Sequence, residues 1–195
     1  MKILAISDVP SKLLWDESVR KRLEGIDLIL SCGDLPKKYL EYLTNFTTAP
    51  ILYVHGNHDG SYKESEPGGC ICVDDAVYVW KGLRIMGLGG CNRYNRDDTF
   101  QYTEAEMRRR VRKLWLAARR AGGIDILLTH APASGLNDGT DKAHKGFRGV
   151  QRSDGPVSAQ VVHPRTYAPE LWGKPAPCLH PGRHDGHQRH RAVRV

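Results

Sequence analysis

The stretch Ile51-Leu52-Tyr53-Val54-His55-Gly56-Asn57-His58-Asp59 decides the fold, because an apolar run of strand length passes directly into a glycine and a group of polar side chains. A second such junction lies upstream, where Leu28-Ile29-Leu30-Ser31-Cys32 runs into Gly33-Asp34-Leu35. Open α/β sheets bind their ligands at the carboxyl ends of the strands. Two acid-bearing corners at strand ends therefore predict one metal site.

The pattern around these two junctions is that of an α/β domain. Apolar runs at residues 2–6, 28–32 and 51–54 alternate with helix-like stretches, which is typical of βαβ units around a buried parallel sheet. The first connector, from Ser11 to Glu24, stops at Gly25 and has an apolar inner face made of Leu14, Val19 and Leu23. The order of elements predicts layered α/β architecture with a mixed sheet.

Further along, turn residues and a capping signal divide the chain. Asp74-Asp75 and Lys81-Gly82 separate the apolar runs at 70–73, 77–80 and 83–86, which predicts a β-meander. Thr103 and Glu106 form a capping box that opens a helix ending at Gly122-Gly123. Its apolar stripe comprises Met107, Val111, Leu114 and Ala118. Residues 126–129 then form another buried strand, which delivers His130 to its end.

Length and composition predict one cytoplasmic domain. The 195 residues are 40% hydrophobic, enough for a substantial core. The apolar run at the N-terminus is too short for a signal peptide, and no run approaches transmembrane length, so no membrane partner is expected. The five cysteines show no zinc-type pairing beyond one Cys-x-Cys at Cys70 and Cys72, and we expect them to be reduced.

The net charge of +7 invites a nucleic-acid interpretation, but the charge is unevenly placed. From Val150 onward there are seven Lys/Arg against three acids, so the rest of the chain is only mildly basic. The clusters Arg108-Arg109-Arg110 and Arg119-Arg120 are consistent with an RNA-binding patch or with a solvated helix face. We favour the solvated face and do not expect a nucleic-acid partner.

Polar side chains follow each strand-like run: Asp8 the first, Asp34 the second, Asn57 and His58 the third, and His130 the later one. The motifs Ser7-Asp8, Gly33-Asp34, Gly56-Asn57-His58-Asp59 and Leu128-Thr129-His130-Ala131-Pro132 stand in this order. Through these four motifs, residues 1–149 resemble the calcineurin-like metallophosphoesterase superfamily. The resemblance implies a four-layer α/β sandwich, with two mixed β-sheets flanked by helices, that is incomplete at its C-terminal part.

The resemblance also implies a hydrolase, a phosphatase that cleaves a phosphate mono- or diester of unknown identity. Two divalent ions about 3.5–4 Å apart hold the ester and generate hydroxide at neutral pH in such sites. By analogy Asp34 bridges both ions, Asp8 binds the first, and Asn57 and His130 bind the second. His58 is then the general acid that protonates the leaving alkoxide, and Asp59 orients its ring. Oxygen and imidazole ligands suit Mn, Fe or Zn better than Ca.

Simpler interpretations exist for each residue taken alone. Asp8 and Asp34 could be helix N-caps, and Asn57-His58 could be turn chemistry. For His55 and His144, which have no motif support, we favour a structural role. The run Gly87-Leu88-Gly89-Gly90 lacks the lysine of a phosphate-binding P-loop, and we interpret it as a close-packed loop beside the site.

The sequence departs from the family pattern in two places. Pro10 stands where the first motif, Asp-x-His, normally has histidine, and no Gly-His-x-His follows His130. The loss of these ligands predicts impaired activity. The alternative is a catalytically silent scaffold with a phosphoesterase fold.

Residues 150–195 form an atypical tail that holds five of the nine histidines and six of the eleven prolines. Disorder is one interpretation. The other is a frameshift near Gly149-Val150: read one base later, codons for Pro164 to Ala168 permit His-Gly-His-Thr-His, and those for Val161 to His163 permit an apolar strand before it.

Overall fold

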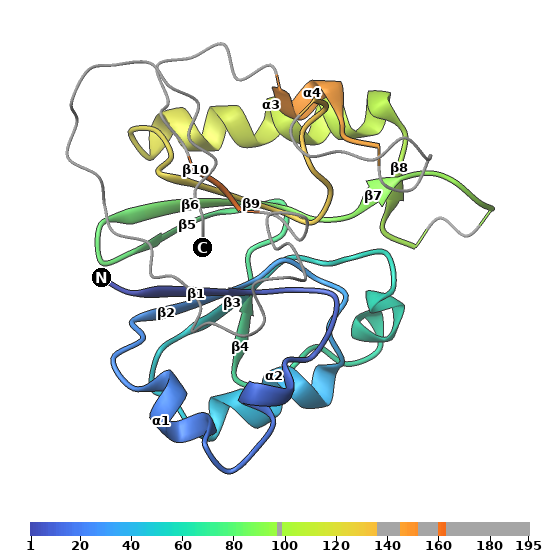
Figure 1. The fold of residues 1–195 in the computed structure, drawn as a ribbon. Coiled ribbons are helices and arrows are strands. Elements are labelled where there is room, and N and C mark those ends of the chain that lie inside the picture. Colours follow the sequence, from blue (N-terminus) through green and yellow to red (C-terminus); the bar gives the residue numbers. More distant parts are fainter. Residues whose placement is uncertain (97–98, 136–144, 152–159, 163–195) are drawn as a thin grey trace.

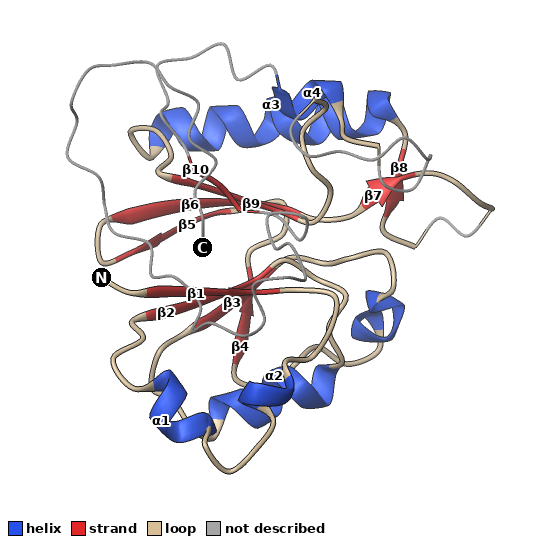
Figure 2. Cartoon of the chain, viewed as in Figure 1, coloured by secondary structure: helices blue, strands red, loops and turns tan. Residues whose placement is uncertain are grey.

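The computed structural model describes residues 1–96, 99–135, 145–151 and 160–162. The helices are α1 (Val19–Leu23), α2 (Lys37–Thr44), α3 (Glu104–Arg120) and α4 (Arg148–Gln151), with 3₁₀ turns at Lys12–Leu14 and Asp59–Lys63. The strands are β1 (Ile3–Ile6), β2 (Leu28–Ser31), β3 (Ile51–Tyr53), β4 (Cys70–Cys72), β5 (Val77–Trp80), β6 (Leu83–Leu88), β7 (Cys91–Asn92), β8 (Gln101–Tyr102), β9 (Ile126–Thr129) and β10 (Gln160–Val162). The predicted α/β class is confirmed (Figure 2).

The first sheet is built from the N-terminal βαβ units. Its order is β1-β2-β3-β4, and all of these strands are parallel, so the expectation that both sheets are mixed is wrong for the part of this sheet that is described. Helices α1 and α2 cover its outer face (Figure 1). Leu14, Val19 and Leu23 are buried on that face, as predicted for the first connector.

The second sheet is mixed. Its order is β10-β9-β6-β5, in which β5 and β6 form an antiparallel hairpin and β6, β9 and β10 are parallel. Helix α3 lies on its outer face (Figure 1) and begins at the predicted capping box of Thr103 and Glu106. The predicted stripe Met107, Val111, Leu114 and Ala118 is buried against this sheet.

The predicted β-meander is wrong, because β4 does not pair with β5. Instead β4 joins the first sheet, where Ile71 lies opposite Leu52 in parallel register. The chain then crosses between the sheets at Asp74-Asp75, where Asp75 adopts a left-handed backbone with φ of 55°. Three residues in a short apolar strand fit either sheet, so the partner of β4 is set by tertiary packing rather than by local sequence.

Alternation along the strands explains why their apolar runs are continuous. In β2, Leu28 and Leu30 point into the core between the two sheets, whereas Ile29 packs toward the helices of the outer layer. Strands covered on both faces need apolar residues at every position. The carboxyl ends of the parallel strands consequently hold the polar residues.

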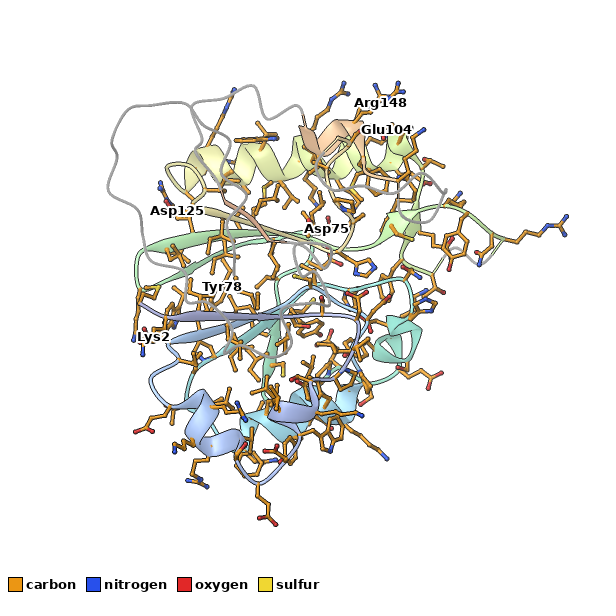
Figure 3. The ribbon with its side chains drawn as sticks, in the orientation of Figure 1. Lys2, Asp75, Tyr78, Glu104, Asp125 and Arg148 are labelled. Carbon is orange, nitrogen blue, oxygen red and sulfur yellow. The ribbon has the colours of Figure 1, made fainter. Side chains whose placement is uncertain are left out.

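After His130, the described residues include helix α4, which lies against α3, and strand β10, which joins the second sheet. Glu104 in the first turn of α3 lies beside Arg148 of α4 (Figure 3), and its carboxylate accepts the backbone N–H groups of Arg148 at 3.2 Å and Gly149 at 2.7 Å. Strand β10 lies inside the tail for which the sequence shows no strand pattern, and pairs with β9. His144 and most of residues 150–195 lie outside the described residues.

Among the residues that the structure describes, no helix has the length and apolar character needed to cross a bilayer.

Candidate metal centre

The carboxyl ends of four parallel strands bring together the side chains predicted from the motifs. Asp8 follows β1, Asp34 follows β2, Asn57 follows β3 and His130 follows β9. The first two corners are joined directly, since the backbone N–H of Asp8 donates to the carbonyl of Gly33 at 3.1 Å. Both aspartates have left-handed backbones, with φ of 56° at Asp8 and 58° at Asp34. Such backbone strain in residues other than glycine is concentrated at functional sites.

Two glycines allow the corners to approach closely. A Cβ added at Gly56 would lie 2.0 Å from Asp34 Oδ1, and one at Gly33 would lie 2.3 Å from the backbone nitrogen of Gly56. No side chain fits at either distance. The glycines of the two motifs thus permit the contact between the second and third strand ends.

His130 is held with one ring nitrogen available. It is 8% exposed, and its Nδ1 lies 2.9 Å from the carbonyl oxygen of Cys32. A carbonyl only accepts, so Nδ1 carries the proton and Nε2 presents a lone pair. That Nε2 lies 3.1 Å from Asn57 Oδ1 and 3.6 Å from Asp34 Oδ2.

The two distances from His130 Nε2 are compatible with pairs of ligands on one cation. Ligands about 2.0–2.2 Å from a metal lie roughly 3–3.6 Å from one another. Across the described ranges no set of three His, Cys, Asp or Glu side chains is arranged to hold a metal ion. A candidate site here would need the amide oxygen of Asn57 as its third donor. A carboxylate, an amide oxygen and an imidazole suit Mn, Fe or Zn.

The ligand set for a second ion is smaller in the described part of the chain. Asp8 is exposed beside the Gly33-Asp34 corner, and Pro10 occupies the position where the resemblance expects an imidazole. Neither aspartate caps a helix: the N-cap residues of the following helical segments are Ser11 and Pro36. The interpretation of Asp8 and Asp34 as N-caps is therefore wrong.

His58 and Asp59 occupy different environments. The His58 side chain is 74% exposed, with Nε2 4.0 Å from Asp34 Oδ2, and its backbone N–H donates to Asp34 Oδ1 at 2.8 Å. Asp59 is 3% exposed, and its Oδ2 accepts the N–H groups of Gly56 at 2.7 Å and Asp34 at 2.9 Å. Burial raises the pKa of Asp59 to about 6, although these two hydrogen bonds oppose the rise.

The role of Asp59 as the group that orients the His58 ring stays a prediction, and the structure shows a further contact of its carboxylate. Its carboxylate ties the backbone after β2 to the backbone after β3, which are the corners that carry Asp34 and Asn57. Asp59 thus positions the metal centre through the main chain.

The sequence matches the family model for the calcineurin-like phosphoesterase superfamily domain over residues 1–154. The chain belongs to this superfamily. Its members are metal-dependent phosphoesterases, a class of hydrolases. No curated protein matches the sequence.

Sequence reasoning missed a buried network beside the candidate centre of this calcineurin-like domain. His55 Nδ1 lies 2.9 Å from Asp74 Oδ2, and the His55 ring stacks on Phe100 with centroids 4.1 Å apart. Asp74 Oδ1 accepts the N–H of Gly89 at 2.7 Å and Nη2 of Arg110 at 2.8 Å. These contacts agree with a structural role for His55.

Arg110 is not part of a solvated face, because its side chain is only 11% exposed. Helical spacing could have indicated this burial, because Arg110 lies three residues after Met107 and next to Val111, and both of these belong to the buried stripe. The neighbouring Arg108 and Arg109 are exposed, as are Arg119 and Arg120.

The glycine run 87–90 packs closely, as predicted, but it is not wholly a loop, because its first two residues end strand β6. A Cβ at Gly89 would lie 2.5 Å from both Asp74 Oδ2 and the carbonyl oxygen of His55. The N–H of Gly90 donates to the same His55 carbonyl at 2.7 Å. The glycine run therefore holds the backbone of His55, the residue directly before Gly56, in place.

Proposed function

We propose that this chain hydrolyses phosphate mono- or diesters with the help of two divalent cations. The observation that carries the proposal is the approach of Asn57 Oδ1, at 3.1 Å, and Asp34 Oδ2, at 3.6 Å, to His130 Nε2. A turn that served only the fold would not gather these donors from three separate strand ends. We also infer that the complete domain is the four-layer sandwich, which the helices covering the outer faces of the two sheets support.

Each ligand has a defined task in this proposal. Asn57 and His130 would hold one cation, Asp8 would hold the other, and the carboxylate of Asp34 would serve both. Bound cations supply Lewis acidity and lower the pKa of bound water, which makes hydroxide available near neutral pH. The chain orients these ligands by hydrogen bonds: His130 Nδ1 lies 2.9 Å from the carbonyl oxygen of Cys32, and the N–H of His58 donates to Asp34 Oδ1.

His58 is the proposed general acid. Its exposed ring beside Asp34 is accessible to a leaving alkoxide, and proton transfer to that oxygen is needed when the leaving group is a poor one. Asp59 keeps the corner in place through its two backbone hydrogen bonds.

Activity is expected to be low. Pro10 supplies no imidazole, and the sequence has no Gly-His-x-His after His130, so the first cation has few ligands. Turnover comparable to that of a relative with the full motif set would contradict this expectation.

The test is Mn²⁺ binding and hydrolysis of an aryl phosphate and a bis-aryl phosphodiester by the purified chain. We expect bound metal and slow, Mn²⁺-dependent release of the aryl alcohol, both lost in Asp34→Asn. The matched control is Asp16→Asn. It changes an exposed aspartate outside the site, whose carboxylate accepts hydrogen bonds from the backbone N–H and the hydroxyl of Ser18. Hydrolysis that survives Asp34→Asn would refute this centre as the source of the activity, and a chain that binds no metal would favour the silent scaffold.

A further inference from the structure

We infer that Tyr94 is a positioning residue for metal binding, acting through the amide of Asn57. The inference rests on the proposed function, since it concerns the same centre. Asn57 Nδ2 donates to the Tyr94 hydroxyl at 3.3 Å, while Oδ1 of the same amide faces His130. Tyr94 belongs to none of the motifs that the sequence comparison singled out.

The structure holds Tyr94 in place from its backbone. Tyr94 lies two residues after the end of β7. The intervening Arg93 donates its backbone N–H to the carbonyl of Tyr102 at 3.0 Å. The N–H of Tyr94 donates at 3.2 Å to the side chain of Gln101, which is 2% exposed. The tyrosine is 38% exposed, so its hydroxyl lies at the rim of the centre.

An asparagine can bind a cation only through its oxygen. Asn57 Oδ1 and His130 Nε2 are 3.1 Å apart, and both present lone pairs when His130 carries its proton on Nδ1. A cation satisfies that pair of acceptors. A half-turn of the amide would instead direct Nδ2–H at His130 and remove both ligands.

Tyr94 favours the metal-bound arrangement by linkage. A cation on Oδ1 polarises the amide and makes Nδ2–H a stronger donor, so its hydrogen bond to Tyr94 is stronger with the ion than without it. A contact that strengthens on binding raises the affinity. Partners of this kind change metal affinity by about 10- to 100-fold.

Aspartate at position 57 would reverse the sign of this effect. A carboxylate has no N–H, so the Tyr94 hydroxyl would have to donate to it. That hydrogen bond is strongest to the free anion, and a cation on the carboxylate weakens it. In the Asn57→Asp background Tyr94 therefore competes with the metal instead of assisting it.

The experiment is a calorimetric titration with Mn²⁺ of four full-length chains: wild type, Tyr94→Phe, Asn57→Asp and the double variant. We expect Tyr94→Phe to weaken Mn²⁺ binding about 10-fold in the wild-type background and not to weaken it in Asn57→Asp. Tyr78→Phe, on β5 outside the site, is the matched control and should bind as wild type does.

The outcomes separate the inference from the proposed function. Equal weakening in both backgrounds would show that Tyr94 only packs the loop, and no weakening in the wild-type background would show that it plays no part; either result overturns the inference alone. A wild-type chain that binds no Mn²⁺ overturns the proposed function together with it.

Discussion

Replacing Asp74 by asparagine is expected to lower the free energy of unfolding by about 3 kcal/mol. Asp74 follows β4 of the first sheet, and its carboxylate contacts His55 of that sheet as well as Gly89 and Arg110 of the second layer. The side chain is only 9% exposed. The buried Asp74 carboxylate therefore connects the first sheet to the second sheet and its covering helix α3.

The magnitude follows from what the substitution leaves behind. Removing one partner of a buried ion pair costs about 3–5 kcal/mol, because the other charge stays buried without compensation. Arg110 would keep Asp75, whose Oδ1 lies 2.8 Å from Nε, and the carbonyl of Gly89 at 2.8 Å. These remaining contacts put the expected loss at the lower end of the range.

The assay is urea unfolding at pH 7 followed by circular dichroism. Asp75→Asn is the matched control: it changes the adjacent aspartate and the same arginine, but that side chain is 48% exposed, so the expected loss is about 1 kcal/mol or less. Equal losses in the two variants, or a loss below about 1 kcal/mol for Asp74→Asn, would refute the reasoning.

Lowering the pH should reduce the difference in unfolding free energy between wild type and Asp74→Asn. Burial acts to raise the pKa of Asp74, but the hydrogen bonds from His55 and Gly89 and the charge of Arg110 bring the pKa below its usual value. A lowered folded-state pKa gives stability that is present above the unfolded pKa of about 3.9 and is lost as pH falls through the folded pKa. The two unfolding curves should therefore converge below about pH 4.

Three further changes test other parts of the structure. Gly56→Ala should abolish Mn²⁺ binding measured by calorimetry, because its Cβ would lie 2.0 Å from Asp34 Oδ1. Thr103→Ala should lower the unfolding free energy by about 1 kcal/mol in urea titration, because it removes the N-cap of α3. His58→Ala should slow hydrolysis of an alkyl phosphate by about 10²–10⁴-fold and that of an aryl phosphate much less, since an aryl oxide leaves without protonation; equal slowing would contradict a general acid.

The frameshift hypothesis has a separate test at the level of the gene. Resequencing the coding region around Gly149 should reveal an open shifted frame that encodes the missing histidine motif. Stop codons in that frame, or codons that cannot encode the motif, would end the hypothesis.

Strand positions were predictable because two-sided burial gives an apolar run, as in Leu28 to Ser31 and Ile126 to Thr129. Parallel pairing in the first sheet placed Asp34 and Asn57 at one edge, and the motif order indicated that His130, from the second sheet, belongs with them. The partner of β4 was not predictable, since three residues with mixed burial fit either sheet. The buried contacts of Asp74 were not predictable either, because its sequence context is that of a turn residue. Its partners His55 and Arg110 lie 19 and 36 residues away in the sequence. Tyr94 was missed for the same reason, being 37 residues from Asn57.

The left-handed backbone of Asp8 has a consequence for how this sequence would respond to selection. A non-glycine residue in that region costs roughly 1–2 kcal/mol, so Asp8→Gly would relieve strain at an exposed position. A library screened only for thermal resistance would be expected to enrich glycine there, whereas one screened for metal binding would retain the carboxylate. Position 8 is thus one position where the two screens should diverge, and the residue recovered would report which property the chain had been selected to keep.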